Sequence, residues 1–209
     1  MTATVRFDAD RHLYFVDGEL IPNATRIIGG LNLHDSTYFT AAAAERGRYI
    51  HECIHLWMQD DLEMVSVYEP YKGYVDSAIR LVEASGVKKS DVRTEIRVYH
   101  PALRYCGTAD WIGPYAGDDS CLDWKSGLIG KPTGIQTALY DMAEPLPNGR
   151  RRRRYGAQLK ANGRLPNVRA LDRRPYDDTG YDYHRAAAAV DLYREFIWER
   201  EKKELLNAA

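Results

Sequence analysis

Two aspartates and a lysine near the middle of the chain have types and a spacing that suit metal-assisted hydrolysis. Asp110 ends the string GTAD, and Asp123 and Lys125 belong to the string DWKSG. Hard cations such as Mg²⁺ and Mn²⁺ prefer oxygen ligands and bind through one or two carboxylates plus substrate phosphate. Such a cation would polarise a phosphodiester and acidify a bound water, while Lys125 would orient or deprotonate that water or neutralise the developing charge. These residues therefore predict phosphodiester hydrolysis.

The segments around the two aspartates read as short strands joined by a turn rich in Pro, Gly and Asp. If the turn centres on Ala116–Gly117, Asp110 and Asp123 face each other across a β-hairpin, where their oxygens could share a cation. Side chains two positions apart on a strand share a face. Lys125 is therefore expected beside Asp123, and Trp124 on the opposite face.

A lone D-x-K triplet most often marks the solvated face of a surface hairpin, so the triplet by itself is a weak signal. Four further motifs accompany it, and together the five form an ordered series. The elements are GRYIH (Gly47–His51), Glu95 in TEIRV, GTAD (Gly107–Asp110), DWKSG (Asp123–Gly127) and QTALY (Gln136–Tyr140).

This series resembles the RecB-type branch of the PD-(D/E)XK nuclease superfamily, particularly its compact phage and prokaryotic exonucleases, whose pattern runs GxxxH, E, GxxD, DxK, QxxxY. All five elements are present in that order. The resemblance implies a restriction-endonuclease-like α/β fold and a metal-dependent deoxyribonuclease activity, with exonuclease favoured over endonuclease. It also implies a role in DNA recombination, DNA repair or phage DNA processing.

The resemblance assigns the metal ligands and the catalytic lysine to positions in this chain. His51, Asp110 and Asp123 match metal ligands of the family, and the backbone carbonyl of Trp124 matches a further ligand. Lys125 matches the catalytic lysine. The implied cofactor is Mg²⁺ or Mn²⁺.

Three more residues match family positions around the metal. Glu95 matches an acidic residue that lies near the metal or its waters and belongs to the catalytic set. Gln136 and Tyr140 match positions that line the active site and approach the nucleic-acid backbone. Their spacing of four residues places them on one face of a helix.

A competing motif overlaps the first element of the series. Residues His51–His55 spell H-E-x-x-H, in which two histidines on one helix bind zinc and the glutamate acts as the base of a metallopeptidase. No further histidine follows at the spacing of metzincins, and Glu69 and Glu83 are only generic candidates for a third ligand. A zinc metallopeptidase would also leave DWKSG and QxxxY unexplained. His55 is therefore expected to pack or to form a hydrogen bond.

Length and composition favour one globular domain over residues 1–209. A hydrophobic content of 44% and a charged content of 28% are ordinary for a soluble protein, and no apolar run is long enough to span a membrane. The first residues lack the apolar core of a signal peptide. These observations predict a cytoplasmic location, in the host cell if the protein is phage-encoded, and no membrane partner.

The three cysteines, Cys53, Cys106 and Cys121, are an odd number without C-x-x-C spacing. This pattern argues against a disulfide framework and against a zinc ribbon. Some members of the family that the chain resembles bind an iron–sulfur cluster through four cysteines, including one cluster near the C-terminus. Because no cysteine follows Cys121, no iron–sulfur cluster is expected.

Positive charge is concentrated in one segment, although the net charge of the chain is −1. Residues 150–174 contain ten basic residues and one acid, Asp172. Within this segment apolar and polar residues alternate, and Asn162–Gly163 predicts a hairpin turn before a second strand. The pattern predicts a half-buried β-hairpin with a cationic rim that contacts phosphates. The residues expected to contact nucleic acid are Arg151, Arg152, Arg153, Arg154 and Lys160, together with Gln136 and Tyr140.

Hydrophobic periodicity and turn residues predict the elements that must position these side chains. An N-terminal hairpin is expected from strands over residues 5–7 and 13–16 with a turn at Asp17–Gly18, and a short helical or loop segment follows over residues 22–30. Three strands around Glu95, Asp110 and Asp123 would form the catalytic sheet. Helices are expected over about residues 40–59, 71–85 and 183–206, with a short one after Gly134.

The predicted fold class is α/β, with a mixed central β-sheet flanked by helices, the site at one edge and a basic β-hairpin added. The expected partner is DNA, as a duplex end or a single strand, and the resemblance is compatible with an annealing protein, a helicase or an oligomer. A second class stays open, a protein that binds nucleic acid with this fold but cuts weakly or not at all. The intact set of His51, Asp110, Asp123 and Lys125 argues against it, because binding alone requires no such set.

Overall fold

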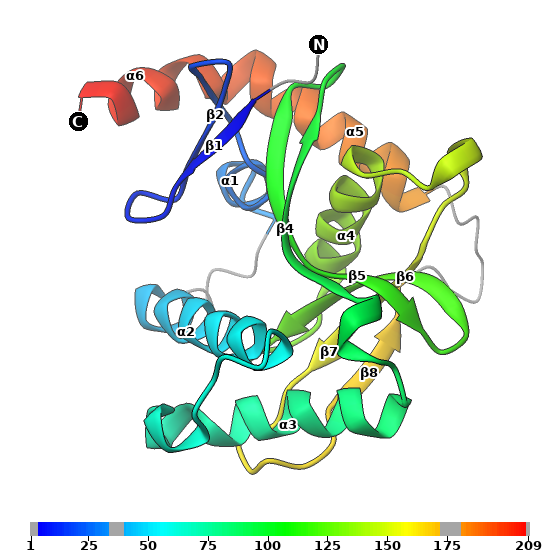
Figure 1. Ribbon diagram of the computed structural model, residues 1–209. Helices are drawn as coiled ribbons and strands as arrows, with labels where there is room; N and C mark the ends of the chain where they lie inside the picture. The colour runs from blue at the N-terminus through cyan, green and yellow to red at the C-terminus, as the bar shows by residue number, and fades with distance from the viewer. Residues whose placement is uncertain (1–3, 34–39, 172–180, 208–209) are drawn as a thin grey trace.

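The computed structural model describes residues 4–33, 40–171 and 181–207. These residues form an α/β structure that contains a mixed five-stranded sheet and a separate three-stranded antiparallel sheet (Figure 1). The α/β class and the mixed sheet were both expected from the sequence. Among the described residues, no helix combines the length and the apolar character that crossing a membrane requires.

The five-stranded sheet carries the motifs and has the strand order β4-β5-β6-β7-β8. Its neighbouring strands are antiparallel, except that β6 and β7 are parallel. A parallel pair requires a long crossover, and helix α4 lies within it. The strands are β4 (Arg93–His100), β5 (Tyr105–Tyr115), β6 (Asp118–Lys125), β7 (Arg153–Gln158) and β8 (Asn167–Ala170).

Helices cover both faces of this sheet (Figure 1). Because successive strand residues point to opposite faces, Trp111 and Leu122 pack with α2 and α3, whereas Ile112 and Cys121 pack with α1, α4 and α5. The sheet is therefore buried on both sides. The helices are α1 (Ala24–Gly30), α2 (Ala41–Met58), α3 (Glu69–Ser85), α4 (Lys131–Ala143), α5 (Tyr181–Tyr193) and α6 (Glu199–Asn207).

Local signals explain where the two central helices begin and end. The Thr40 hydroxyl accepts a hydrogen bond from the Ala43 N–H at 3.1 Å, which caps the start of α2. Helix α3 ends at Gly86, whose φ of 68° is left-handed and suits glycine. Both helices match the sequence predictions to within two residues. The predicted C-terminal helix is also present, but α5 passes through a π-helical stretch, Arg194–Trp198, before α6.

The three-stranded sheet consists of β1 (Val5–Asp8), β2 (Leu13–Val16) and β3 (Glu19–Ile21). The prediction of the first hairpin was wrong in one respect, because the Asp17–Gly18 turn joins β2 to β3 and not β1 to β2. The β1–β2 turn instead contains His12 in a left-handed conformation. This turn has no glycine, so no clear signal in the sequence marks it.

The basic hairpin is present, but its setting differs from the prediction. Strands β7 and β8 pair antiparallel, with a turn around Asn162–Gly163 as expected. However, β7 is an inner strand between β6 and β8, and its middle residues are buried on both faces. Arg154 of β7 is therefore buried, at 1% exposed, and Arg152, just before the strand, is buried against Asp141 at 7% exposed, so neither forms a cationic rim. Residues 172–174 of the basic segment lie outside the described residues.

Candidate active site

The β5–β6 hairpin has the register predicted from its turn. Ala116 and Gly117 have φ values of 53° and 86°, as a tight two-residue hairpin turn requires. The ladder runs from Tyr115–Asp118 to Trp111–Leu122. One further step in the same register sets Asp110 opposite Asp123.

Side chains from three separate elements converge beside this hairpin. His51 of α2, Glu95 of β4 and Asp110 of β5 each offer a ligand atom, and these atoms all lie within 4.8 Å of one another. His51 Nδ1 lies 3.3 Å from Asp110 Oδ1, and His51 Nε2 lies 3.0 Å from the Trp124 carbonyl oxygen. The Trp124 N–H donates to Asp110 Oδ2 at 2.8 Å. Four of the residues predicted around the metal are thus brought together.

Asp123 lies beside this cluster as a fully buried carboxylate. Its Oδ2 lies 2.6 Å from Lys125 Nζ, whereas its Oδ1 has no hydrogen-bond partner among the described residues. A buried carboxylate oxygen without a hydrogen bond is costly, and a cation would satisfy it. Carboxylate oxygens, a carbonyl oxygen and one imidazole form a donor set that suits Mg²⁺ or Mn²⁺. The residues present therefore fit a divalent metal.

The charges in the cluster shift the pKa values of its members in opposite directions. Burial lowers the pKa of His51, but Asp110, Glu95 and Asp123 outweigh it and raise that pKa to about 9. Burial raises the pKa of Asp110, but the adjacent His51 and Lys125 bring it below its usual value. His51 and Asp110 therefore form an ion pair in the absence of metal.

The other two carboxyl groups keep their protons to a higher pH. Burial, followed by the charge of Asp110, raises the pKa of Glu95 to about 7 against the opposing effect of His51. Burial raises the pKa of Asp123 to about 6, although Lys125 opposes it. Three acids in so small a volume cannot all ionise without additional positive charge.

Glu95 has an unusual backbone conformation for the middle of a strand. Its φ is 51°, in the left-handed region, while its neighbours Thr94 and Ile96 pair with Trp111 and Ala109 in one continuous register. No residue is inserted, so the strand changes direction at Glu95 alone. A non-glycine residue in this region carries a cost that surrounding structure must offset, and such residues cluster at functional sites.

Helix α4 places Gln136 and Tyr140 close to Lys125. Lys125 Nζ donates to Gln136 Oε1 at 3.0 Å, and Gln136 Nε2 donates to the Tyr140 hydroxyl at 2.7 Å. A Cβ on Gly107 would lie 2.7 Å from Cε1 of Tyr140, so the first residue of GTAD leaves room for the tyrosine ring. Two motifs that are separate in sequence thus fit against each other.

The second histidine of HECIH is not part of the cluster. His55 Nδ1 lies 2.6 Å from the Thr94 hydroxyl oxygen, whereas His51 contacts Asp110 and Trp124. Glu52 is exposed. The described residues therefore give no geometric support to a zinc site of the metallopeptidase type.

The basic residues predicted to contact nucleic acid have different environments. Arg151 is exposed and lies over the Tyr183 ring at 4.4 Å, while Arg153 pairs with Asp118 at 3.6 Å. The Lys160 side chain is half-buried, and its backbone N–H donates to the Ser77 hydroxyl. Arg152 and Arg154 form the interior ion pairs described below. The exposed part of this segment is therefore smaller than its composition suggested.

Sequence reasoning missed two contacts at the site. The Tyr14 hydroxyl lies 2.5 Å from the Thr108 hydroxyl oxygen, which brings the N-terminal sheet to the GTAD strand. Arg46 Nε donates to the Ser126 hydroxyl at 3.3 Å, next to Lys125. Neither contact has a local sequence signal, because the partners are 94 and 80 residues apart.

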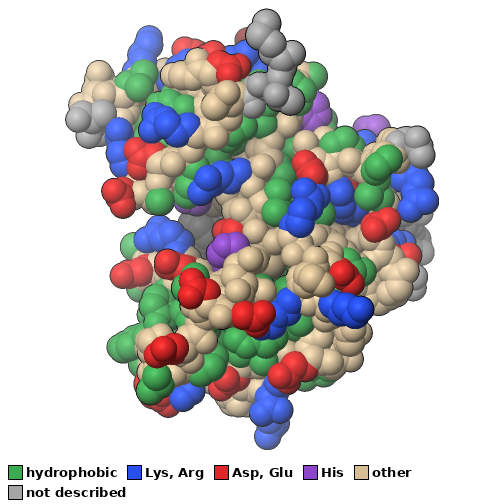
Figure 2. All heavy atoms as spheres, viewed as in Figure 1, with side chains coloured by type: hydrophobic (Ala, Val, Ile, Leu, Met, Phe, Trp, Pro, Cys, Tyr) green, Lys and Arg blue, Asp and Glu red, His purple; other side chains and the backbone are tan. Residues whose placement is uncertain are grey.

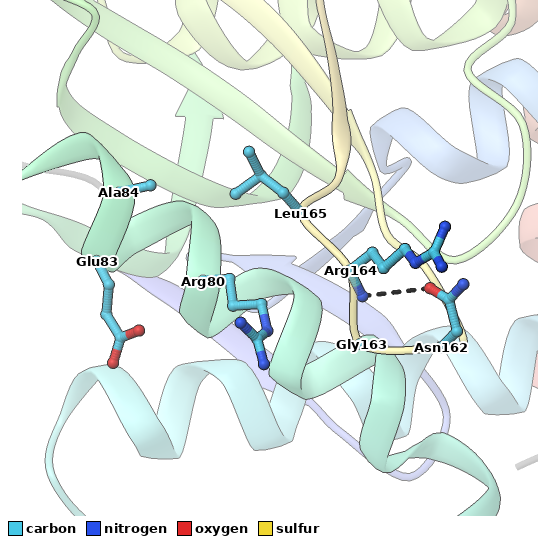
Figure 3. A pocket seen from close by; sticks show the side chains of 7 residues that line it. All are labelled: Arg80, Glu83, Ala84, Asn162, Gly163, Arg164 and Leu165. Carbon is cyan, nitrogen blue, oxygen red and sulfur yellow. Dashed lines mark hydrogen bonds between the residues drawn. The ribbon is translucent and has the colours of Figure 1, made fainter.

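The surface has a hollow beside the N-terminal sheet and a separate pocket away from the candidate site. Figure 2 shows a hollow between the part of the molecule that carries β1–β3 and the part that carries α2, with charged and histidine side chains at its edge. A separate pocket of about 680 Å³ lies between α3 and the β7–β8 loop (Figure 3). Its lining includes no residue of the candidate site and consists of Arg80, Glu83, Ala84, Asn162, Gly163, Arg164 and Leu165.

Comparison with protein-family models gives no matching family, and comparison with curated proteins gives no match. The functional assignment of this chain therefore depends on the residues and the geometry described above.

Proposed function

We propose that this protein is a metal-dependent DNA nuclease of the PD-(D/E)XK type, with a restriction-endonuclease-like core. The observation that carries the proposal is the convergence of His51, Glu95 and Asp110 beside the buried Asp123–Lys125 pair. This arrangement combines a set of metal ligands with a lysine at the distance of a direct contact. The resemblance of the five motifs to RecB-type nucleases supports the same conclusion.

The residues divide into those that bind the metal and those that act on the water and the phosphate. His51, Glu95, Asp110 and Asp123 would hold Mg²⁺ or Mn²⁺, with the Trp124 carbonyl as a further donor. The bound cation supplies polarisation of the phosphate and a water of lowered pKa. Metal ligation requires the unprotonated forms of these side chains, so protons leave His51 and Glu95 as the site fills.

Lys125 contributes a second positive charge beside the metal ligands. Its ammonium contacts Asp123 and donates to Gln136, and these two contacts fix its position. A fixed ammonium stabilises charge that develops on phosphate oxygens and can orient the attacking water. Gln136 acts through Lys125 and is a positioning residue, and the Tyr140 hydroxyl accepts a hydrogen bond from its amide.

The preference for exonuclease activity rests on the resemblance to compact phage exonucleases, as do the proposed roles in recombination, repair or phage DNA processing. Fold alone does not determine which DNA a nuclease cuts. DNA topology is therefore the variable that separates an exonuclease from an endonuclease.

The test is degradation of end-labelled linear duplex, linear single-stranded DNA and closed circular DNA by the purified protein with Mg²⁺ or Mn²⁺. We expect loss of linear DNA, sparing of the circle, and no cleavage with a chelator, with Asp123→Ala or with Lys125→Ala. Cleavage of the circle would identify an endonuclease. Absence of any cleavage by the wild-type protein would overturn the proposed function.

Two variants control for nonspecific effects of removing charge. Asp119 is an exposed carboxylate on the same strand as Asp123, and it lies 3.5 Å from Arg150. Lys131 is an exposed lysine at the start of α4. Asp119→Ala and Lys131→Ala should degrade linear DNA at the wild-type rate.

A further inference from the structure

An aromatic cluster lies on one face of the N-terminal sheet. The rings of Phe7 and Tyr14 have centroids 4.7 Å apart, and His12 contacts both rings edge-on at 5.3 and 5.8 Å. Tyr14 is buried, whereas Phe7 and His12 are half-buried and reach solvent. The cluster thus presents two accessible rings supported by a buried one.

This cluster adjoins the candidate active site. Tyr14 contacts Thr108, and Thr108 lies two residues from Asp110 on the same face of β5. On the neighbouring strand, Arg97 is paired with Thr108 and is exposed, and its guanidinium lies 5.1 Å from the centre of the Phe7 ring. Two residues of a strand span about 7 Å. The residue that the Tyr14 hydroxyl contacts, Thr108, is therefore about 7 Å from Asp110 along β5.

Positive charge surrounds the cluster from three elements. Arg48 of α2 and Arg26 of α1 both act on His12, where they add to the effect of burial in lowering its pKa. Arg97 of β4 supplies the third guanidinium. Two acids are close to these groups, because Glu201 pairs with Arg26 at 3.4 Å and Glu95 acts on the Tyr14 hydroxyl. A depression of about 360 Å³ adjoins the cluster at His12, and its other lining residues are Asn23, Thr25, Arg26, Gly29, Gly30 and Glu201.

The segment that follows the N-terminal sheet is hydrogen-bonded to β5. The Cys106 N–H donates to the Pro22 carbonyl at 2.9 Å, and Asn23 forms a β-bridge with Cys106 on β5. The hollow in Figure 2 lies between this sheet and α2. The sheet that carries the rings is therefore joined to β5, the strand that carries Asp110, through Tyr14–Thr108 and Asn23–Cys106.

We propose that the face formed by Phe7, His12 and Arg97 binds a single strand of DNA, by stacking on its bases and contacting its phosphates, and delivers that strand to the active site. This inference rests on the proposed nuclease function and adds the strand class of the substrate. Aromatic rings within a positively charged groove bind single strands because unpaired bases expose their faces. The bases of a duplex are stacked on each other and offer no such face.

The test measures binding of a fluorescein-labelled oligothymidylate and of a duplex of matched length with hairpin-capped ends, by fluorescence anisotropy in EDTA. The wild-type protein should bind the single strand more tightly than the capped duplex. Phe7→Ala and Arg97→Gln should each weaken binding of the single strand by about tenfold, within the range measured for one stacked base.

The chain offers a matched control for Phe7. Phe15 is a half-buried phenylalanine in the same sheet with Arg6 over its ring at 4.0 Å, but it packs on the opposite core cluster. Phe15→Ala should therefore bind the single strand as the wild type does. Thermal unfolding followed by circular dichroism identifies any variant that fails to fold, and Arg97→Gln removes no core side chain.

The outcomes separate this inference from the proposed function. If the wild type degrades linear DNA but Phe7→Ala, Arg97→Gln and Phe15→Ala all bind the single strand equally well, the strand-binding face is refuted and the nuclease stands. Equal or tighter binding of the capped duplex by the wild type also refutes it. If no DNA is cut with Mg²⁺ or Mn²⁺, the nuclease itself is refuted, whatever the binding results.

Discussion

At the residue scale, the candidate site supplies its own counter-ions. Asp110 pairs with His51, and Asp123 contacts Lys125, so two of the acids face a cation that belongs to the chain. Among the described residues Glu95 forms no ion pair of its own, and burial, followed by the charge of Asp110, raises its pKa to about 7. A metal ion that enters the site therefore competes with the protons of His51 and Glu95 and with the ammonium of Lys125.

Metal affinity should consequently depend on pH. The folded pKa values of Asp123 and Glu95 are raised to about 6 and about 7, and that of His51 to about 9, so each protonated form persists to a higher pH than usual. Mn²⁺ binding should tighten from pH 6 to pH 9 and should release protons, as isothermal titration calorimetry in buffers of different ionisation enthalpy would show. An affinity that does not change across this window would contradict the assignment of these ligands.

A substitution at Gly107 tests whether the contact between GTAD and QTALY is needed for cleavage. Gly107→Ala would place a methyl group where the Tyr140 ring lies, and the displaced ring would disturb Gln136 and Lys125. We expect cleavage of linear DNA to slow by about 100-fold, because small displacements of catalytic groups have effects of that size. Gly29→Ala is the control, because no atom lies within 4 Å of the Cβ it would add, and it should cut normally.

At the element scale, buried arginines tie β7 to the helices of one face. Arg154 lies 3.4 Å from Asp182 at the start of α5 and donates to the Gly134 carbonyl of α4 at 2.6 Å. Arg152 lies 3.2 Å from Asp141 of α4, whose other oxygen accepts from the Tyr183 hydroxyl. The run of arginines thus fixes the helix that carries Gln136 and Tyr140.

Truncation of one buried arginine should therefore lower stability far more than truncation of an exposed one. Arg154→Ala removes the buried guanidinium that lies between Asp182 and the Gly134 carbonyl, and it should lower the free energy of unfolding by about 3–5 kcal/mol. Arg150 is exposed, and Arg150→Ala should change the free energy of unfolding by less than about 0.5 kcal/mol. Urea unfolding followed by circular dichroism measures both values, and equal effects would show that the Arg154 pair is not a stabilising contact.

The sequence predicted those elements whose signals are local. The Ala116–Gly117 turn set the register of Asp110 and Asp123, and Thr40 and Gly86 marked the ends of helices. The burial of Arg154 escaped prediction because its partner, Asp182, is 28 residues away and no local pattern shows that β7 has a strand on each side. The same reason hid the contact between Tyr14 and Thr108.

The left-handed Glu95 escaped prediction for a different reason. Glutamate has no intrinsic preference for that region, so the conformation is imposed by the surrounding sheet and not by the residue. The motif series nevertheless identified Glu95 as a site residue. Residue identity was readable from the sequence, while backbone geometry was not.

At the scale of the whole molecule, the site joins elements that are distant in sequence. His51, Glu95 and Asp110 come from a helix and two strands, so a metal that binds all three stabilises only the folded chain. A free Mn²⁺ concentration 100 times the dissociation constant should add about 2.7 kcal/mol to the free energy of unfolding.

Differential scanning calorimetry with and without Mn²⁺ measures this effect. The unfolding midpoint of the wild type should rise with Mn²⁺, and that of Asp110→Asn should rise much less. Asp119→Asn, with its exposed side chain, should respond as the wild type does. An equal response of all three proteins would place metal binding somewhere other than this cluster.

The burial of all three cysteines makes the protein suitable for selective chemical labelling. Cys53, Cys106 and Cys121 are free thiols with little contact with solvent, so maleimide should react with them slowly in the native state. A cysteine introduced at Leu128, which is 69% exposed and three residues beyond Lys125, would then be the main reactive thiol. A fluorophore at that position would report the arrival of a DNA strand at the site, and one at Val65, which is 87% exposed in the turn between α2 and α3, would serve as the reference.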